Sequence, residues 1–307
     1  MTHAPFRFGM QVHAPLAGLS WLDSARKIED QGYDSLLMPD HFGEQWSPIA
    51  ALSGAAAVTT QLKVGALVFG NDYRHPVILA KEMATLDRMS DGRVEFGIGA
   101  GWMRTDYDQS GMSYDRPGKR IDRMIESLEI VKKCWAGESF SYEGEHYTID
   151  GYDGHPKPER DIPIIIGGGG PRMLGVAAEH ADIVGITANL KAGEIGPDAI
   201  ADSMPEAYDA KVARVREVAG DRPREFSSLA FATIVTDDRA GQIAGLSAMF
   251  GMPEEAVAAS PAVIVGDVDE ICDILVERRE RWGFNYVVVQ DGIDDRFAEV
   301  VARLAGS

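Results

Sequence analysis

A (β/α)8 barrel is the fold class that this sequence predicts, because short apolar runs alternate with amphipathic stretches along the whole chain and eight such pairs can be counted. The 307 residues suit a barrel with insertions, since such barrels use about 250 residues or more in one domain. The composition shows no break, so residues 1–307 are predicted to form a single domain. A doubly wound open sheet also alternates strands with helices and is the alternative.

The first half of the chain contains four strand–helix pairs. FRFGMQV predicts a strand, and the helix after it has Ser20 as its N-cap, with Trp21, Ala25 and Ile28 on one face. In the next three pairs the apolar period also changes from two to about 3.6. The predicted strands and helices of these pairs are 35–39 with 47–60, 62–69 with 76–90, and 93–99 with 120–137.

The second half contains the other four pairs and two insertions. FSYEGEHYTI predicts a β-hairpin at 140–149, and residues 238–260 predict a helical insertion. Ser203 and Glu206 have the spacing of a capping box and predict the start of a helix. The remaining predicted strands are 162–166, 182–188, 227–235 and 285–290, and the remaining predicted helices are 173–181, 269–284 and 295–306.

Long segments follow the predicted fourth, sixth and seventh strands. In a (β/α)8 barrel such segments lie at the C-terminal face, where the active site is found. We therefore expect residues 103–117, 189–206 and 238–260 to shape the pocket, and 189–206 to be a mobile lid. No motif in these segments identifies a substrate.

The charge of the chain argues against several classes of partner. The chain has 30 Lys and Arg against 48 Asp and Glu, and its formal charge of -18 repels nucleic acid and anionic membrane surfaces. MTHAPFRFGM lacks the pattern of a secretory signal, and no stretch approaches the roughly 20 apolar residues that span a bilayer, so a cytoplasmic protein is expected. Cys134 and Cys272 lie in predicted helices and cannot form a metal site by themselves, so no metal is predicted.

The predicted fifth strand runs into four glycines in IPIIIGGGGPRM. Pro171 suits the first turn of a helix, so the backbone N–H groups of Gly168, Gly169 and Gly170 lie where the helix dipole is positive. The loop is therefore a candidate anion site, to which Arg172 adds charge. A tight or flexible turn without a ligand is the alternative. The spacing matches neither a dinucleotide fingerprint nor a phosphate-binding P-loop.

Other predicted strand ends also carry candidate residues. Asp40 and His41 follow the second strand, and Gly101 and Trp102 follow the fourth. Helix capping without any ligand is the alternative role of an aspartate in this place. A lone histidine at a strand end is more often structural than catalytic. Because the ends of all barrel strands meet at one face, their combination with the glycine loop favours a ligand site.

Together these motifs resemble the luciferase-like monooxygenase superfamily, and within it the actinobacterial branch of F420-dependent oxidoreductases. The resemblance covers nearly the whole chain and is densest in PDHFG, RHPVILAKEMATLDRMSDGRVEFGIGAGW, GEHYTI and IPIIIGGGG. It implies a (β/α)8 barrel, a homodimer, and a cofactor at the C-terminal face that is either FMN or the deazaflavin coenzyme F420.

The resemblance also assigns cofactor-binding residues by position. It places Asp40 and His41 beside the ring system of the cofactor. Leu67 and Val68 match a bulge behind the ring that often holds a non-prolyl cis peptide in the family, and the sequence does not decide whether this bond is cis. A loop beside the cofactor corresponds to Ala100, Gly101 and Trp102. The phosphate-binding turn corresponds to Gly168, Gly169, Gly170, Pro171 and Arg172.

Two positions depart from the patterns of the superfamily. FMN-using members often carry an arginine for the phosphate where this chain has Ala100, so the resemblance favours F420. The F420-dependent sugar-phosphate dehydrogenases carry a catalytic glutamate where this chain has Trp102, so their chemistry is not transferred to it. Basic residues are expected to hold the anionic cofactor, and Arg104, Lys157 and Arg172 are the candidates.

The resulting hypothesis is an oxidoreductase that transfers a hydride between F420 and a small organic substrate, with His41 as general acid or base. His13 also lies at a strand end, but a structural histidine is the stronger interpretation of it, and His75 is expected to anchor the start of a helix. The alternative hypothesis is an FMN monooxygenase that uses dioxygen. A flavin or F420 reductase is the expected redox partner. A barrel that binds a flavin without turnover is a third hypothesis.

Overall fold

The computed structural model describes residues 4–194 and 197–307. Two segments discussed above lie partly outside these ranges. They are the N-terminal stretch, at residues 1–3, and the expected lid, at residues 195 and 196. Within the described ranges, no helix combines the length and the hydropathy needed to cross a bilayer.

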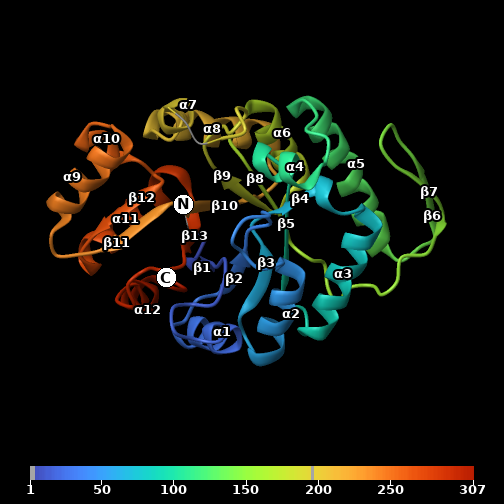
Figure 1. The fold of residues 1–307 in the computed structure, drawn as a ribbon, viewed down its shortest axis with the longest axis horizontal. Coiled ribbons are helices and arrows are strands. Elements are labelled where there is room, and N and C mark those ends of the chain that lie inside the picture. Colours follow the sequence, from blue (N-terminus) through green and yellow to red (C-terminus); the bar gives the residue numbers. More distant parts are fainter. Residues whose placement is uncertain (1–3, 195–196) are drawn as a thin grey trace.

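Eight parallel strands close into a barrel, which confirms the predicted fold (Figure 1). Strand β1 pairs with both β2 and β13, and a pairing between β3 and β5 completes the ring. Because the sheet closes, the doubly wound open sheet is wrong for this chain. The barrel strands are β1 (Arg7–Gln11), β2 (Ser35–Met38), β3 (Lys63–Ala66), β5 (Val94–Gly99), β8 (Ile164–Gly168), β9 (Ile183–Ile186), β10 (Glu225–Ala230) and β13 (Phe284–Gln290).

A helix follows each barrel strand and covers the outside of the barrel (Figure 1). The first begins as predicted, because the Ser20 side chain accepts a hydrogen bond from the backbone N–H of Asp23. The covering helices are α1 (Trp21–Asp30), α2 (Pro48–Val58), α3 (Pro76–Met89), α5 (Pro117–Ala136), α6 (Pro171–His180), α8 (Pro205–Ala219), α11 (Val268–Trp282) and α12 (Phe297–Leu304).

Further elements extend the connections between these units. The hairpin of β6 and β7 lies at one side of the molecule and α9 with α10 at the opposite side (Figure 1). The extra elements are β4 (Phe69–Gly70), the short 3-10 helix η1 (Asn71–Tyr73), α4 (Arg104–Ser110), β6 (Phe140–Glu143), β7 (Thr148–Tyr152), α7 (Pro197–Ala201), β11 (Ala232–Val235), α9 (Arg239–Phe250), α10 (Glu254–Ala259) and β12 (Val263–Gly266).

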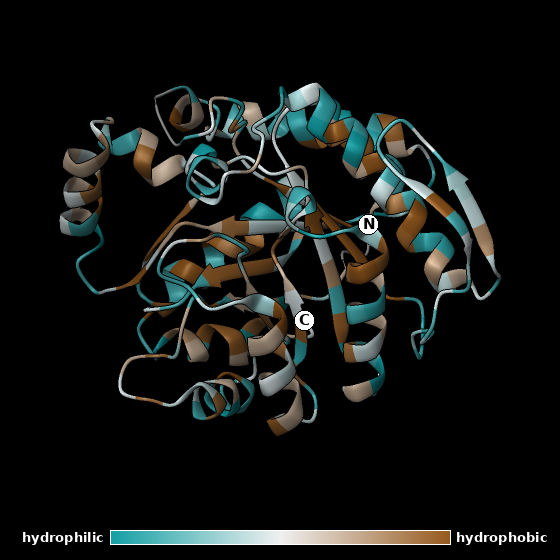
Figure 2. Ribbon diagram, turned by 45° about the vertical axis from the view of Figure 1, so that its right-hand side comes forward, coloured by the Kyte–Doolittle hydropathy of each residue, from teal (hydrophilic) through white to brown (hydrophobic). Residues whose placement is uncertain are grey.

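Two layers of apolar side chains hold the barrel together, and its central strands are hydrophobic in Figure 2. The larger layer lies between the strands and the helices. The smaller layer includes Leu37, Ile165 and Tyr286. Leu67 and Leu229 pack against this smaller cluster and also line the main cavity, so the filled barrel forms a floor for that cavity.

The N-terminal end of the barrel is closed by a charged cluster around Arg7. Its guanidinium forms ion pairs with Asp34 at 2.7 Å, Glu95 at 2.6 Å and Glu225 at 2.9 Å. The Tyr286 hydroxyl donates a further hydrogen bond to Glu95 at 2.9 Å. Each buried charge therefore has partners, as buried ions require.

The structure corrects several predicted elements. The predicted strand 227–235 is split, because β10 ends at Ala230 and the chain then forms β11, which pairs with the unpredicted strand β12. The capping box at Ser203 is wrong, because α8 begins at Pro205 and the Ser203 hydroxyl donates to the carbonyl of Ala199 instead. Helix α4 was also not predicted, and α5 begins three residues earlier than 120.

Candidate functional site

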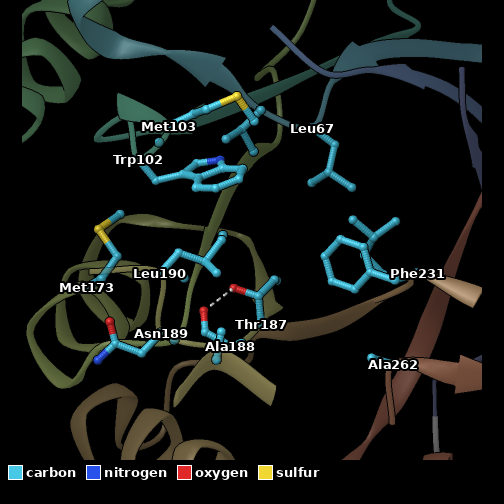
Figure 3. Close-up of a pocket in the computed structure, with 18 of the residues that line it drawn as sticks. Leu67, Trp102, Met103, Met173, Thr187, Ala188, Asn189, Leu190, Phe231 and Ala262 are labelled. Carbon is cyan, nitrogen blue, oxygen red and sulfur yellow. Dashed lines mark hydrogen bonds between the residues drawn. The ribbon is translucent and has the colours of Figure 1, made fainter. Parts of the chain in front are cut away.

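A cavity of about 700 Å³ opens at the C-terminal ends of the barrel strands, within the range of sites for small molecules and cofactors (Figure 3). Its wall contains the residues that the resemblance assigned to the site by position. These are Asp40, His41, Leu67, Val68, Ala100, Gly101, Trp102, Gly168, Gly169, Gly170, Pro171 and Arg172. The structure thus brings the predicted residues together, while their individual roles stay predictions.

His41 is held by a buried carboxylate. Its Nδ1 lies 2.6 Å from Oδ2 of Asp106, and its ring meets the ring of Trp102 edge-on with centroids 5.5 Å apart. Asp106 also accepts hydrogen bonds from the backbone N–H of Phe42 at 3.2 Å and from the Tyr73 hydroxyl at 3.0 Å. Burial, and then the charge of Asp106, raises the pKa of Tyr73 well above its usual value, so this hydroxyl stays a donor.

Sequence reasoning missed Asp106. It lies in α4, within the segment 103–117, where no helix was predicted. The signal was weak, because 65 positions separate Asp106 from His41 and nothing in the sequence pairs them. With Asp106 at Nδ1, the Nε2 atom of His41 is the ring nitrogen left to exchange a proton with a ligand.

Asp40 is occupied by partners of its own. Its carboxylate forms a two-point ion pair with Arg74, at 2.5 and 3.1 Å, and accepts the backbone N–H of Gly70 at 3.0 Å. The side chain is buried, so this pairing joins the end of β2 to the segment after β3. The expected contact of Asp40 with a cofactor ring is a prediction that these bonds do not test.

The peptide bond between Leu67 and Val68 is cis, which the sequence left undecided. The Gln11 side chain donates a hydrogen bond to the Leu67 carbonyl at 2.7 Å. In Figure 3 the Leu67 side chain points into the cavity toward Phe231. The cis bond therefore lies in the wall, at the predicted place.

Close packing accounts for one glycine of the loop, and the anion site expected there stays a prediction. A Cβ atom at Gly169 would clash with the backbone of Thr187 and Ala188, so close packing against the segment after β9 requires a glycine there. Gly168 and Gly170 do not have a positive φ. Helix α6 begins at Pro171 as predicted, and its first N–H groups still face the cavity end of β8.

Arg172 lies at the cavity but is already paired. Its guanidinium forms an ion pair with Asp122 and donates to the carbonyl of Gly118 at 3.0 Å. These contacts attach the start of α6 to the start of α5. Of the other two expected cations, Lys157 donates to the carbonyl of Cys134 and Arg104 is largely exposed, and neither lines the cavity.

Arg120 is a buried cation in the cavity wall that sequence reasoning missed. Its exposed fraction is only 3%, and its Nη1 donates to the carbonyl of Asp115 at 2.6 Å. Its Nε is buried without a hydrogen-bond partner, and the guanidinium forms no ion pair with any residue in the described ranges. It stacks over Tyr114 at 4.1 Å from the ring centroid. A signal was present, because Arg120 lies in the apolar stripe that continues with Met124.

A second histidine, His13, also lines the cavity. Its Nδ1 lies 3.1 Å from Asp291, which also accepts the backbone N–H of His13 at 3.0 Å. The hydrogen bond that His13 donates to the Asp291 carboxylate raises the pKa of His13. His75 caps the start of α3 as expected and does not line the cavity.

Comparison with known proteins agrees with the fold. The profile of the luciferase-like monooxygenase family matches residues 1–251. A protein of Nakamurella multipartita named F420-dependent glucose-6-phosphate dehydrogenase is 30% identical over 227 residues, which cover 71% of this chain and 66% of that protein. The 5,10-methylenetetrahydromethanopterin reductase of Archaeoglobus fulgidus is 31% identical over 241 residues, which cover 77% of this chain and 66% of that protein.

Among solved structures, the coenzyme F420-dependent tetrahydromethanopterin reductase of Methanopyrus kandleri has a TM-score of 0.75, with 97% of each chain covered. Its sequence is 23% identical to this chain, so this likeness shows the fold. The chain spans slightly less than two thirds of the two relatives that it matches in sequence.

Proposed function

The chain belongs to the luciferase-like monooxygenase family, and from this premise we propose that it is an oxidoreductase that transfers a hydride between coenzyme F420 and a small organic substrate. The names of its relatives support the cofactor, since one is an F420-dependent dehydrogenase at 30% identity. Ala100 in the cavity wall supports it as well, because FMN-using members often carry an arginine there for the phosphate.

The observation that carries this proposal is the unpaired guanidinium of Arg120 in the cavity wall. A buried cation without a carboxylate is costly unless an anion completes its environment. Arg172 bonds to Gly118 and so holds the N-terminus of α6, another favourable place for an anion, beside the start of α5. Arg120 and the loop Gly168–Pro171 both line the cavity, and their donors fit the phosphate of a deazaflavin cofactor, which they would hold.

Different residues of the cavity wall would then have different roles in binding and proton transfer. When bound, F420 supplies the hydride chemistry. Leu67 and Val68 form the apolar seat, and Trp102 covers a further side of the cavity. Asp106 holds the Nδ1 side of His41, so that Nε2 gives or takes the proton that accompanies hydride transfer to or from the substrate.

Equilibrium binding of F420 and of FMN to the purified protein, measured side by side by fluorescence, tests the proposal. We expect tighter binding of F420, and weaker F420 binding in Arg120→Gln. Preference for FMN, followed by oxygen consumption with a flavin reductase present, would instead support the monooxygenase. Stoichiometric binding without turnover over a broad substrate panel would favour a binding protein.

We also propose that the protein forms a homodimer, as the resemblance implies. Ile78 and Met89 on α3 support this, because their side chains are 55% and 62% exposed although both are large and apolar. Sedimentation equilibrium would test it, with Ile78→Asp expected to shift the protein toward a monomer.

A further inference from the structure

We propose that the substrate of this enzyme is an uncharged, predominantly apolar molecule and not a sugar phosphate or another anion. This inference rests on the proposed function, because it assigns the substrate to the part of the cavity that the cofactor residues do not line. We define the apolar lobe of the cavity as the part of its wall that residues of the segments 199–204 and 229–263 form.

The apolar lobe is lined by large hydrocarbon side chains and by thioethers. No charged residue in the described part of these two segments lines it. Figure 3 shows Phe231 and Ala262 away from Met173 and Asn189, which lie near the glycine loop. The residues that shape the lobe include Ile200, Met204, Leu229, Phe231, Met252 and Val263.

The polar side chains of the apolar lobe are already used within the protein. The Ser203 hydroxyl donates to the carbonyl of Ala199 at 2.8 Å. The Ser260 hydroxyl donates to the carbonyl of Ser203 at 3.1 Å and accepts the backbone N–H of Ala262 at 3.3 Å. A phosphate or carboxylate placed in the lobe would lose its water and gain no cation in return.

The titratable groups of the cavity lie on other elements. His13 and His41 follow β1 and β2, Arg120 lies on α5 and Arg172 on α6. Lys191 also lines the cavity, in the segment after β9. The cavity is therefore divided into a charged side, where the proposed anionic cofactor and proton donor lie, and an apolar side.

The fold builds the apolar side as a packed unit. Strands β11 and β12 pair in parallel, and a separate apolar cluster that includes Ile243, Leu246 and Val257 supports them from α9 and α10. The buried Arg278 donates to the carbonyls of Ser260, Pro261 and Val263. The wall is thus held in place by its own core and is not a loose loop.

Aromatic side chains also remain exposed at the lobe. Phe231 is 43% exposed and Phe250 is 39% exposed, and both line the cavity. Large apolar side chains at a cavity are favourable when an apolar ligand covers them. Met249, the neighbour of Phe250 on α9, is 74% exposed but does not line the cavity, so it is a matched control.

Displacement of the neutral apolar fluorophore N-phenyl-1-naphthylamine from the apoprotein tests this inference. Straight-chain alkan-2-ones of increasing length are the competitors. Burial of each further methylene in an apolar lobe should tighten binding by roughly two- to fourfold until the lobe is full. Glucose 6-phosphate should not displace the probe. Phe250→Asp should weaken binding of the longer ketones at least fivefold, whereas Met249→Asp should leave it unchanged.

The outcomes separate this inference from the proposed function. The ketone series needs no cofactor, so a rise in affinity with chain length supports the apolar lobe even if F420 does not bind. Affinities that do not depend on chain length in the wild-type protein would overturn the inference, whether or not the variants fold. Displacement by glucose 6-phosphate, or equal losses in Phe250→Asp and Met249→Asp, would also overturn it.

Discussion

At the N-terminal end of the barrel Arg7 contacts three carboxylates, whereas at the C-terminal end Arg120 has no ionic partner within the described chain. Both guanidiniums are largely buried, so the difference does not come from exposure. At the closed end the charges satisfy one another and join β1, β5 and β10 to the residue that precedes β2. At the open end the Arg120 guanidinium has no carboxylate partner among the described residues, so we expect an anionic ligand to complete its environment. The difference distinguishes the Arg7 cluster, which stabilises the fold, from Arg120, which we expect to bind a ligand.

The largest effect is expected from His41→Ala at the open end. Loss of the proton-transfer group should lower kcat by a factor on the order of 10²–10⁴, with the dissociation constant of F420 changed by less than roughly threefold. His75→Ala is the control, because His75 caps α3 and does not line the cavity. Steady-state kinetics and fluorescence titration check both. Full turnover by His41→Ala would remove His41 from the mechanism.

A comparable effect, on stability and not on catalysis, is expected at the closed end. Arg7→Met leaves Glu95 and Glu225 without their cation and should lower the free energy of unfolding by about 3–5 kcal/mol. Arg88→Met breaks a half-exposed ion pair with Glu159 and should cost less than about 1 kcal/mol. Urea unfolding measures both. Equal losses would show that burial of the Arg7 cluster is not what matters.

A smaller effect is expected from Arg120→Gln, which removes a charge from the open end. A hydrogen bond to a charged group contributes about 1.5–3 kcal/mol, so the dissociation constant of F420 should rise by roughly 10- to 100-fold. Unfolding should be little changed, because Arg120 has no ionic partner to lose among the described residues. Arg104→Gln, at a side chain 59% exposed, is the control. A normal F420 affinity in Arg120→Gln would contradict the assigned phosphate site.

The smallest effect is expected from His13→Asn. The pKa of His13 is raised by Asp291, so the stabilisation from protonated His13 is present below its usual pKa of about 6.5 and is lost as pH rises through the raised value. The variant should thus be less stable than wild type near pH 5.5 and equally stable near pH 9, with pH values approximate. The difference should stay below about 1 kcal/mol because the ring is 38% exposed. Thermal melts at both pH values check the sign.

Much of the fold could be predicted because its signals are local. The change of apolar period marks a strand or a helix within a few residues, and the end of each barrel strand then lies at a known face. That reasoning placed His41, Trp102 and the glycine loop in one cavity wall. It failed at β12, where VIVG is too short and too uniform to be told from the surrounding helical pattern.

The sequence by itself determined the barrel, the face that carries the cavity and part of the cavity wall, because periodicity and turn chemistry act between near neighbours. Only the tertiary structure decided which charges meet. Arg172, which looked like the free cation, pairs with Asp122 across 50 positions, while Arg120 is left in the wall without a carboxylate. Asp106 reaches His41 across 65 positions for the same reason. Partners of this kind depend on how distant elements pack, and one sequence contains no local trace of that packing.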